Sequence, residues 1–182
     1  MGKANYGYCC INLTLQKNHD IKIGRSMIKR TFTAKGIKYA GELAEANVRD
    51  LIEIIKWNHK QGINVYRMSS SMFPWMSEYE LTDLPNWQTI SNLLKGAGTL
   101  VQKYGQRVGF HPGQFCVLPS PTPKVVTSAI RELDQSALIL DSMGLPQNHT
   151  YSMNIHVGGS YGDKDAAKQR FVDNFKRLSP SA

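Results

Sequence analysis

Four short runs of apolar and β-branched residues predict strands, because each run is followed by polar or turn-forming residues. The predicted strands are residues 7–15, 64–68, 107–110 and 151–156. Elsewhere the apolar side chains recur every three or four residues, which is the spacing of an amphipathic helix. This spacing predicts helices over 41–60, 85–105, 126–140 and 163–178. Strand and helix therefore alternate four times along the chain.

This alternation predicts an α/β fold with a parallel sheet covered by helices. The 182 residues give about 45 residues for each βα unit. Four such units make either an open sheet or half of an eight-unit barrel. No Gly-x-Gly-x-x-Gly sequence follows the first strand, which disfavours a dinucleotide-binding fold. The length suits one core, and we expect a single domain over residues 1–182.

Two of the five histidines close apolar strands, and the ends of parallel strands are where α/β enzymes place their chemistry. His111 ends the third strand, directly before a Pro-Gly break, and His156 ends the fourth strand 45 positions later. A lone histidine in such a position is more often a hydrogen-bonded core residue than a ligand. Two histidines at equivalent positions of successive units also fit a shared metal ion. The spacing leaves both interpretations open.

Two histidines do not complete a metal site, which needs three or more protein ligands. Glu78, in the loop after the second strand, is the acid in the most comparable position. The alternatives are Glu80, Asp83, Asp163 and Asp165. No Ser-His-Asp or Cys-His arrangement stands out, so metal chemistry is the catalytic class that the pattern favours.

Positive charge is concentrated near the N-terminus. The chain has a formal net charge of +8, and residues 1–40 alone hold eight basic residues and one acid. The basic residues are Lys3, Lys17, Lys22, Arg25, Lys29, Arg30, Lys35 and Lys38. Such a segment is either a solvated loop or a surface that binds a polyanion such as the DNA backbone. Under the second interpretation, Lys17, Lys22 and Arg25 contact DNA phosphates.

Composition argues against membrane and secreted classes. No apolar run approaches the roughly 20 residues of a membrane span, and the N-terminus lacks the apolar region of a signal peptide. The three cysteines have no Cys-x-x-Cys spacing, which argues against a disulfide framework or a zinc knuckle. We expect a cytoplasmic protein, nucleoid-associated if it is bacterial or phage, without a membrane partner or an obligate protein partner.

Aromatic side chains gather at the same predicted rim of the sheet. Tyr8, Trp75 and Phe115 fit either packing or stacking on nucleobases. Gln114 beside Phe115, in the loop after the third strand, is suited to filling a gap in a base stack.

A set of motifs occurs together and in a fixed order along the whole chain. The motifs are GYCCINLTL at 7–15, YRMSS at 66–70, HPGQF at 111–115, NIHVGG at 154–159 and YGDK at 161–164. As a set they resemble the UV-damage endonuclease family. The resemblance implies a TIM-type β/α barrel that cuts double-stranded DNA 5′ to ultraviolet photoproducts. It also implies metal-assisted hydrolysis in DNA excision repair, with a cluster of divalent metal ions, often manganese.

The resemblance also implies roles for individual residues. His111 and His156 fall on metal-ligand positions of the catalytic centre, with Glu78 a possible third ligand. Glu78 stands where the family commonly has histidine. Members of the family are much longer than this chain, which resembles their N-terminal half. We therefore expect the first four βα units of a repair endonuclease, with little activity and poor stability in isolation.

Three further residues fall on family positions that insert into the duplex at the lesion: Tyr8, Gln114 and Phe115. Phe115 departs from the family, which usually has tyrosine there, so this chain keeps the ring and lacks the hydroxyl.

Two other classes remain open. A different metal-dependent barrel enzyme, such as a sugar isomerase, also uses strand-end histidines and carboxylates. A DNA-binding module without catalysis fits the basic segment and the short chain.

Overall fold

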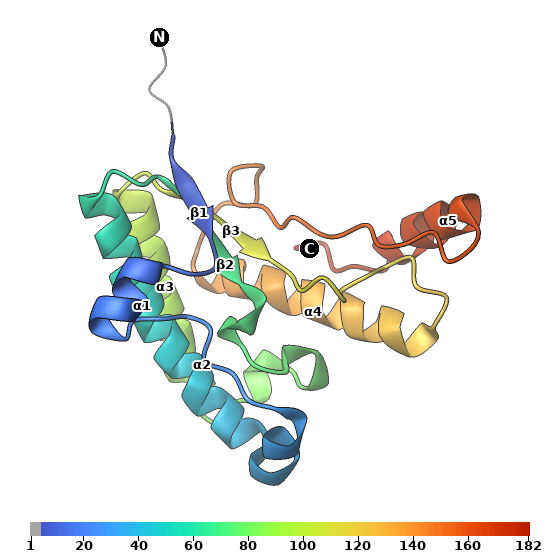
Figure 1. Cartoon of the computed structure of the whole chain (residues 1–182), viewed down its shortest axis with the longest axis horizontal. Helices are drawn as coiled ribbons and strands as arrows, with labels where there is room; N and C mark the ends of the chain where they lie inside the picture. The colour runs from blue at the N-terminus through green and yellow to red at the C-terminus, as the bar shows by residue number, and fades with distance from the viewer. Residues whose placement is uncertain (1–4) are drawn as a thin grey trace.

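A three-stranded parallel sheet lies at the centre of the computed structural model, which describes residues 5–182 (Figure 1). The strands are β1 (Gly7–Cys9), β2 (Val65–Ser69) and β3 (Arg107–His111), in the order β1-β2-β3. Helices connect them, so the predicted α/β fold with a parallel sheet is confirmed. Lys3 of the basic group, and with it the start of the predicted domain, lies outside the described residues.

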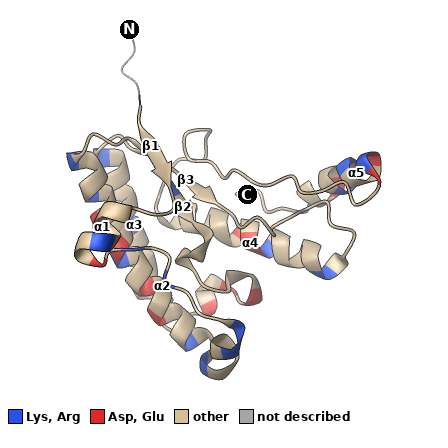
Figure 2. Ribbon diagram, viewed as in Figure 1, with Lys and Arg blue, Asp and Glu red and all other residues tan. Residues whose placement is uncertain are grey.

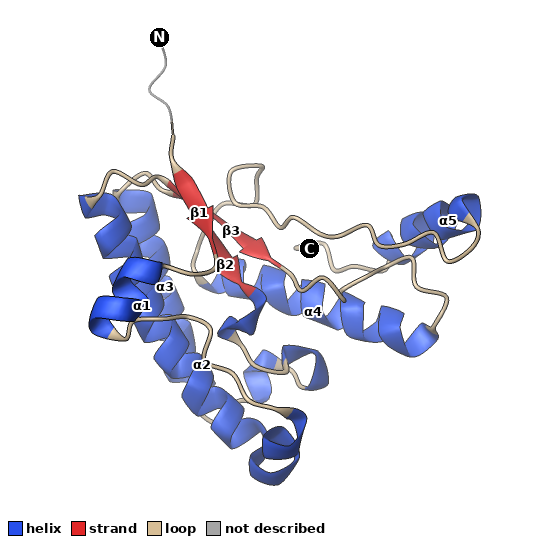
Figure 3. Ribbon diagram, viewed as in Figure 1, coloured by secondary structure: helices blue, strands red, loops and turns tan. Residues whose placement is uncertain are grey.

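The described residues form five α-helices, which Figure 3 shows around the sheet. They are α1 (Leu13–His19), α2 (Lys29–Lys60), α3 (Trp87–Lys103), α4 (Pro123–Ser142) and α5 (Lys164–Phe175). The loop after β2 adds three short 3-10 helices: η1 (Ser70–Met72), η2 (Met76–Glu78) and η3 (Leu81–Asp83). The predictions of α3, α4 and α5 are confirmed. None of the helices formed by residues 5–182 is long and apolar enough to cross a membrane.

Alternation along β2 gives the sheet two different faces. Tyr66 and Met68 are 1% and 0% exposed, in the same apolar cluster as the inner faces of α2 and α3. Arg67 and Ser69 point to the opposite face, which is only partly covered. The parallel register places His111 beside Ser69 on that second face. The core therefore lies on one side of the sheet and the candidate chemistry on the other.

The first predicted strand is only partly correct. β1 ends at Cys9, and Cys10 adopts a left-handed backbone with φ of 61°. Asn12 then caps α1, because its Oδ1 accepts a hydrogen bond from the Leu15 N–H at 2.9 Å. Apolar alternation over 11–15 predicted a strand, but the turn at Cys10 and the asparagine cap favour a helix there.

Helix α2 begins at Lys29, twelve residues before the predicted start at 41. The apolar stripe over 41–60 marks only the part of α2 that packs on the core, whereas the first part is mostly exposed. Gly36, with φ of 63°, interrupts the helix between these parts. The basic segment is therefore not one loop, as the prediction had it: α1 and the start of α2 contain much of it.

The fourth predicted strand, 151–156, does not form a regular strand. Its chain runs parallel to β3 and makes one isolated bridge, between Phe110 and Met153. The Phe110 N–H donates to the Ser152 carbonyl at 3.1 Å, and the Asn154 N–H donates to the Phe110 carbonyl at 3.3 Å. The prediction that this segment lies next to β3 is therefore correct, but the prediction that it pairs with β3 as a regular strand is wrong.

Candidate functional site

His111 and His156 lie side by side at one end of the sheet. The centroids of their rings are 5.7 Å apart and the ring planes are inclined at 51°. His111 is the last residue of β3 and half-buried, whereas His156 follows the bridge at Met153 and is exposed. The predicted proximity of the two histidines is thus confirmed, and their role as metal ligands stays a prediction.

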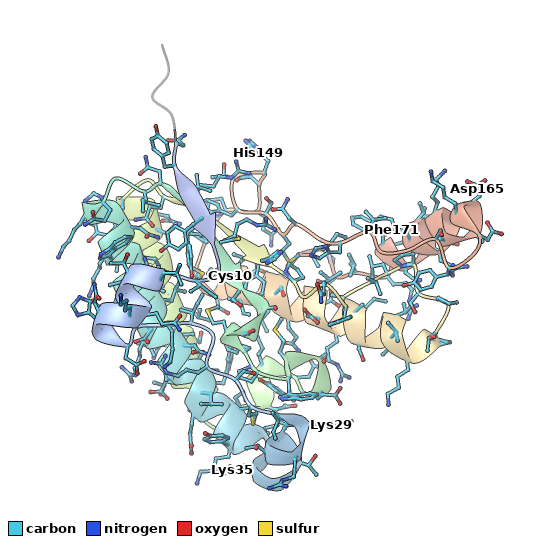
Figure 4. All side chains as sticks on the ribbon, viewed as in Figure 1. Cys10, Lys29, Lys35, His149, Asp165 and Phe171 are labelled. Atoms are coloured by element: carbon cyan, nitrogen blue, oxygen red, sulfur yellow. The ribbon has the colours of Figure 1, made fainter. Side chains whose placement is uncertain are left out.

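The Cys10 thiol holds one nitrogen of His111. Cys10 Sγ lies 3.4 Å from His111 Nδ1, and Figure 4 places Cys10 at the lower end of β1. Burial lowers the pKa of His111, and the positive charges of Arg67 and of His156 lower it further. The imidazole is therefore neutral near pH 7, which is the form that binds a metal ion.

Arg67 is a charged residue of this face that the sequence analysis missed. It lies on β2 between two buried residues, Tyr66 and Met68, so its side chain extends from the face that also carries His111. Its Nε is buried and has no hydrogen-bond partner among the described residues. An unpaired guanidinium donor at such a site fits an anion such as a phosphate. A charged residue inside an otherwise apolar strand was the signal available in the sequence.

A third metal ligand is not supplied by the described part of the chain. Within residues 5–182, no three histidine, cysteine, aspartate or glutamate side chains are grouped so as to hold a metal ion. Glu78 is exposed at the end of η2 and lines a hollow of about 370 Å³ together with Phe115 and Lys124. The expectation that Glu78 completes a site with the two histidines is therefore not met in this structure. The two adjacent imidazole rings fit a divalent ion as part of a larger ligand set.

The loop after β3 presents Gln114 and Phe115 at the tip of a tight turn. The Cys116 N–H donates to the Gly113 carbonyl at 2.9 Å, which closes a four-residue turn around the pair. The Phe115 side chain is 82% exposed, and Gln114 is exposed as well. The predicted exposure of the pair is thus confirmed.

Tyr8 has a different environment from this turn. It lies in β1 on the face that carries Tyr66, and the two ring centroids are 4.9 Å apart. Its hydroxyl donates to Asn58 Oδ1 of α2 at 2.8 Å and accepts from Asn12 Nδ2 at 2.7 Å. Burial raises the pKa of Tyr8, so the phenol is neutral at physiological pH. Tyr8 ties the sheet edge to α2, which disfavours the predicted insertion into DNA.

Part of the basic segment is neutralised within the protein. Arg25 Nη1 lies 2.7 Å from Asp50 Oδ2 and 2.6 Å from the Lys22 carbonyl. Lys22 Nζ lies 2.6 Å from Asp20 Oδ1. These contacts hold the segment against α2, so the prediction of Arg25 as a phosphate contact is not supported. Lys17 is exposed on α1 and remains a candidate.

The start of α2 carries exposed positive charge instead (Figure 2). Lys29 and Arg30 open the helix, its first turn contains no acid, and no side chain caps it. Cations are unfavourable at a helix N-terminus, so this end attracts an external anion. Figure 4 shows Lys29 and Lys35 at the same end of the helix.

Aromatic packing connects this basic end to the loop after β2. The Phe32 ring stacks on Trp75 with 5.6 Å between centroids, and it lies 6.2 Å from the Tyr79 ring. Trp75 Nε1 donates to the Met27 carbonyl at 3.0 Å. Trp75, which the sequence left open between packing and base stacking, is therefore a packing residue here.

Comparison with known proteins identifies relatives over nearly the whole chain. The model of the family described as UV-endonuclease UvdE matches residues 4–182. The chain is 39% identical over 172 residues to the UV-damage endonuclease of Neurospora crassa, a match that covers 91% of this chain and 26% of the relative. It is 34% identical to the UV-damage endonuclease of Schizosaccharomyces pombe, with coverage of 98% and 30%.

A solved structure shows the same arrangement of elements. The crystal structure of SacUVDE superposes with a TM-score of 0.84 at 28% identity, over 98% of this chain and 58% of that one. The chain thus spans between about a quarter and three fifths of the lengths of these relatives. Because the family model matches nearly every residue, the chain belongs to the UV-endonuclease UvdE family.

Proposed function

We propose that this chain provides the first part of an endonuclease that cuts DNA 5′ to ultraviolet photoproducts. The observation that carries the proposal is the proximity of His111 and His156 beside the exposed Gln114–Phe115 turn, in a chain of the UvdE family. The site joins a candidate metal-binding face to a candidate wedge for the duplex. The sheet would form part of a TIM-type barrel in the whole enzyme.

His111 and His156 would together hold a divalent ion, with manganese the expected metal, and further ligands would have to come from other residues of the whole enzyme. Such an ion supplies charge that polarises a phosphate and makes a water molecule more acidic. Cys10 fixes the ring of His111 through its Nδ1. Arg67, on the same face, would donate to a phosphate oxygen and keep the backbone at the site.

The Gln114–Phe115 turn would open the duplex at the lesion. A phenyl ring that is 82% exposed can stack where a damaged base has left the helix, and the amide of Gln114 can pair with a base edge. The exposed cations at the start of α2, and Lys17, would hold the backbone without regard to sequence. Recognition would then depend on how easily the duplex deforms at a photoproduct.

The test uses the longest protein that the gene encodes, incubated with Mn²⁺ and an end-labelled duplex that carries one photoproduct. We expect a nick immediately 5′ to the lesion and none in the undamaged duplex. Equal cleavage of both duplexes would contradict the proposal, as would cleavage that survives removal of the metal with EDTA. The same assay on residues 1–182 measures how much activity this portion retains.

A second candidate is a DNA-binding protein without catalysis. The absence of a third metal ligand within residues 5–182 favours it for this portion alone. Salt-sensitive binding of damaged duplex, unaffected by EDTA and without nicking by the longest protein, would identify it. The sugar isomerase class has no support in the family to which the chain belongs.

A further inference from the structure

Helix α4 holds the exposed turn at both of its corners. At the first corner, the Gly113 N–H donates to Glu132 Oε1 at 2.9 Å. At the second corner, Cys116 Sγ lies 3.4 Å from the Ala129 carbonyl, and Cys116 is 3% exposed. Ala129 and Glu132 are three residues apart and therefore lie on one face of the helix. One rigid element thus fixes both ends of the turn that presents Phe115.

Glu132 is an unusual residue for a position of this kind. Glu132 is half-buried, and burial raises the pKa of its carboxyl group, while the hydrogen bond from the Gly113 N–H acts in the opposite direction. The neighbouring Arg131 does not neutralise it, because Arg131 Nε lies 3.2 Å from Glu80 Oε1. No ion pair formed by residues 5–182 includes Glu132. Even partial burial of an unpaired carboxyl group is costly, so packing alone does not explain a glutamate here.

The space around the turn is open on both sides, so the turn needs this support. Phe115 borders one hollow of about 280 Å³ with Trp75 and Glu132, and a second of about 370 Å³ with Glu78. An exposed phenyl ring between two hollows gains few contacts of its own. Its direction is therefore set by the backbone at Gly113 and Cys116.

We propose that Glu132 is a positioning residue that orients the Gln114–Phe115 turn for insertion into DNA. The inference rests on the proposed function and deepens it, since it assigns to α4 the work of holding the wedge in its inserting orientation before DNA arrives. A wedge that is already ordered avoids losing conformational entropy when it binds, which raises affinity for the damaged duplex. Glu132 does not itself contact DNA in this proposal.

The experiment compares Glu132→Gln with Glu132→Ala in the longest protein that the gene encodes. Glutamine keeps a carbonyl acceptor for the Gly113 N–H, whereas alanine removes it; both remove the negative charge. Glu53→Ala, an exposed glutamate of α2 paired with Lys56, controls for the change in net charge. The duplex carries one photoproduct beside 2-aminopurine, whose fluorescence rises when stacking is lost. Titrations yield affinities for damaged and undamaged duplexes.

We expect Glu132→Ala to bind the damaged duplex about tenfold more weakly and to give a smaller fluorescence rise, with undamaged binding unchanged. Glu132→Gln and Glu53→Ala should stay within about twofold of the parent. Parent-like discrimination by Glu132→Ala would overturn the proposal. So would an equal loss for both Glu132 variants, because that result would assign the effect to charge or folding.

Amide exchange in the free protein separates this inference from the proposed function. If Glu132 holds the turn, the Gly113 amide exchanges about tenfold faster in Glu132→Ala and keeps its protection in Glu132→Gln. Unchanged exchange in Glu132→Ala would overturn the inference even if the parent recognises damage. A parent that does not discriminate damaged duplex, although Gly113 is protected, would overturn the proposed function and with it the role in insertion.

Discussion

The end of β3 and the start of α2 are both candidate DNA-contacting regions, but different interactions stabilise them. At the end of β3, His111 contacts Cys10, and the turn after it is held by Glu132 of α4, which accepts a hydrogen bond from the Gly113 N–H. At the start of α2, exposed cations follow one another with neither a cap nor an acid in the first turn. Under the proposed function, the first region would select the shape of the damaged duplex, whereas the second would attract the negative charge of its backbone. Discrimination and general affinity should therefore respond to different substitutions.

The largest effect should follow removal of His111. His111→Ala deletes one of the two paired imidazoles, so we expect Mn²⁺ affinity to fall about a hundredfold or more. Isothermal titration with Mn²⁺ measures this loss, and the nicking assay on the longest protein should show a comparable loss. His149→Ala is the matched control, since His149 is exposed in the loop before residue 151. If His111→Ala and His149→Ala bind Mn²⁺ equally well, His111 is not a metal ligand.

The next effect should come from the wedge. Phe115→Ala removes a ring that would stack on a base, which is worth about 1–3 kcal/mol. We expect a roughly tenfold or greater loss in affinity for the damaged duplex and little change for the undamaged one. Phe115→Tyr keeps the ring and should bind like the parent. A loss of the same size on both duplexes would mean that the turn does not discriminate.

A smaller effect, and one without discrimination, should come from α2. The double variant Lys29→Ala/Arg30→Ala removes two exposed cations, so the salt dependence of log K should become shallower by about two. Damaged and undamaged duplexes should lose affinity equally. Arg25→Ala serves as the contrast, because Arg25 is paired with Asp50 and should affect thermal stability more than the salt slope. If the double variant loses more affinity for the damaged duplex than for the undamaged one, the start of α2 also contributes to discrimination and the two regions do not differ in this way.

The smallest effect should be a pH dependence of stability. The pKa of His111 is lowered in the folded protein, so the unfolded chain binds a proton more readily. Above the ordinary histidine pKa near 6.5, His111 is neutral in both states and does not affect stability. As the pH falls from 6.5 toward the folded pKa of His111, the unfolded chain is protonated first, and the free energy of unfolding decreases. Thermal melts with EDTA should show a steeper fall below pH 6.5 for the parent than for His111→Gln. If the melting temperatures of the parent and of His111→Gln fall equally with pH, the lowered pKa of His111 is contradicted.

The sequence predicted the parts of the fold that depend on regular burial. The apolar spacing from Ile90 to Val101 defined α3, and the run before His111 defined β3, because each repeats the period of its element. The same logic placed His156 beside His111, since neighbouring parallel segments end at one edge of a sheet. It failed at Cys10, where a single left-handed residue ends β1 and apolar alternation continues past it.

The rest of the site depends on contacts between distant residues, which local patterns do not encode. Glu132 reaches Gly113 across 19 positions, and the apolar stripe of α4 says nothing about where its polar residues point. Arg25 looked like a free cation until the fold placed Asp50 beside it. Tyr8 looked like an inserting residue until Asn12 and Asn58 were seen to bind its hydroxyl.

The break at Gly36 has a mechanical consequence. It divides α2 into a longer rod, residues 37–60, whose inner face packs on the core, and a short basic rod, residues 29–35. The short rod is attached through Phe32 to Trp75 and Tyr79 of the loop after β2. Stacked rings rather than flexible chain therefore fix the distance between the cations at the start of α2 and the loop after β2. Under the proposed function, the packing of these three aromatic residues would therefore set the length of DNA backbone that the protein contacts at once.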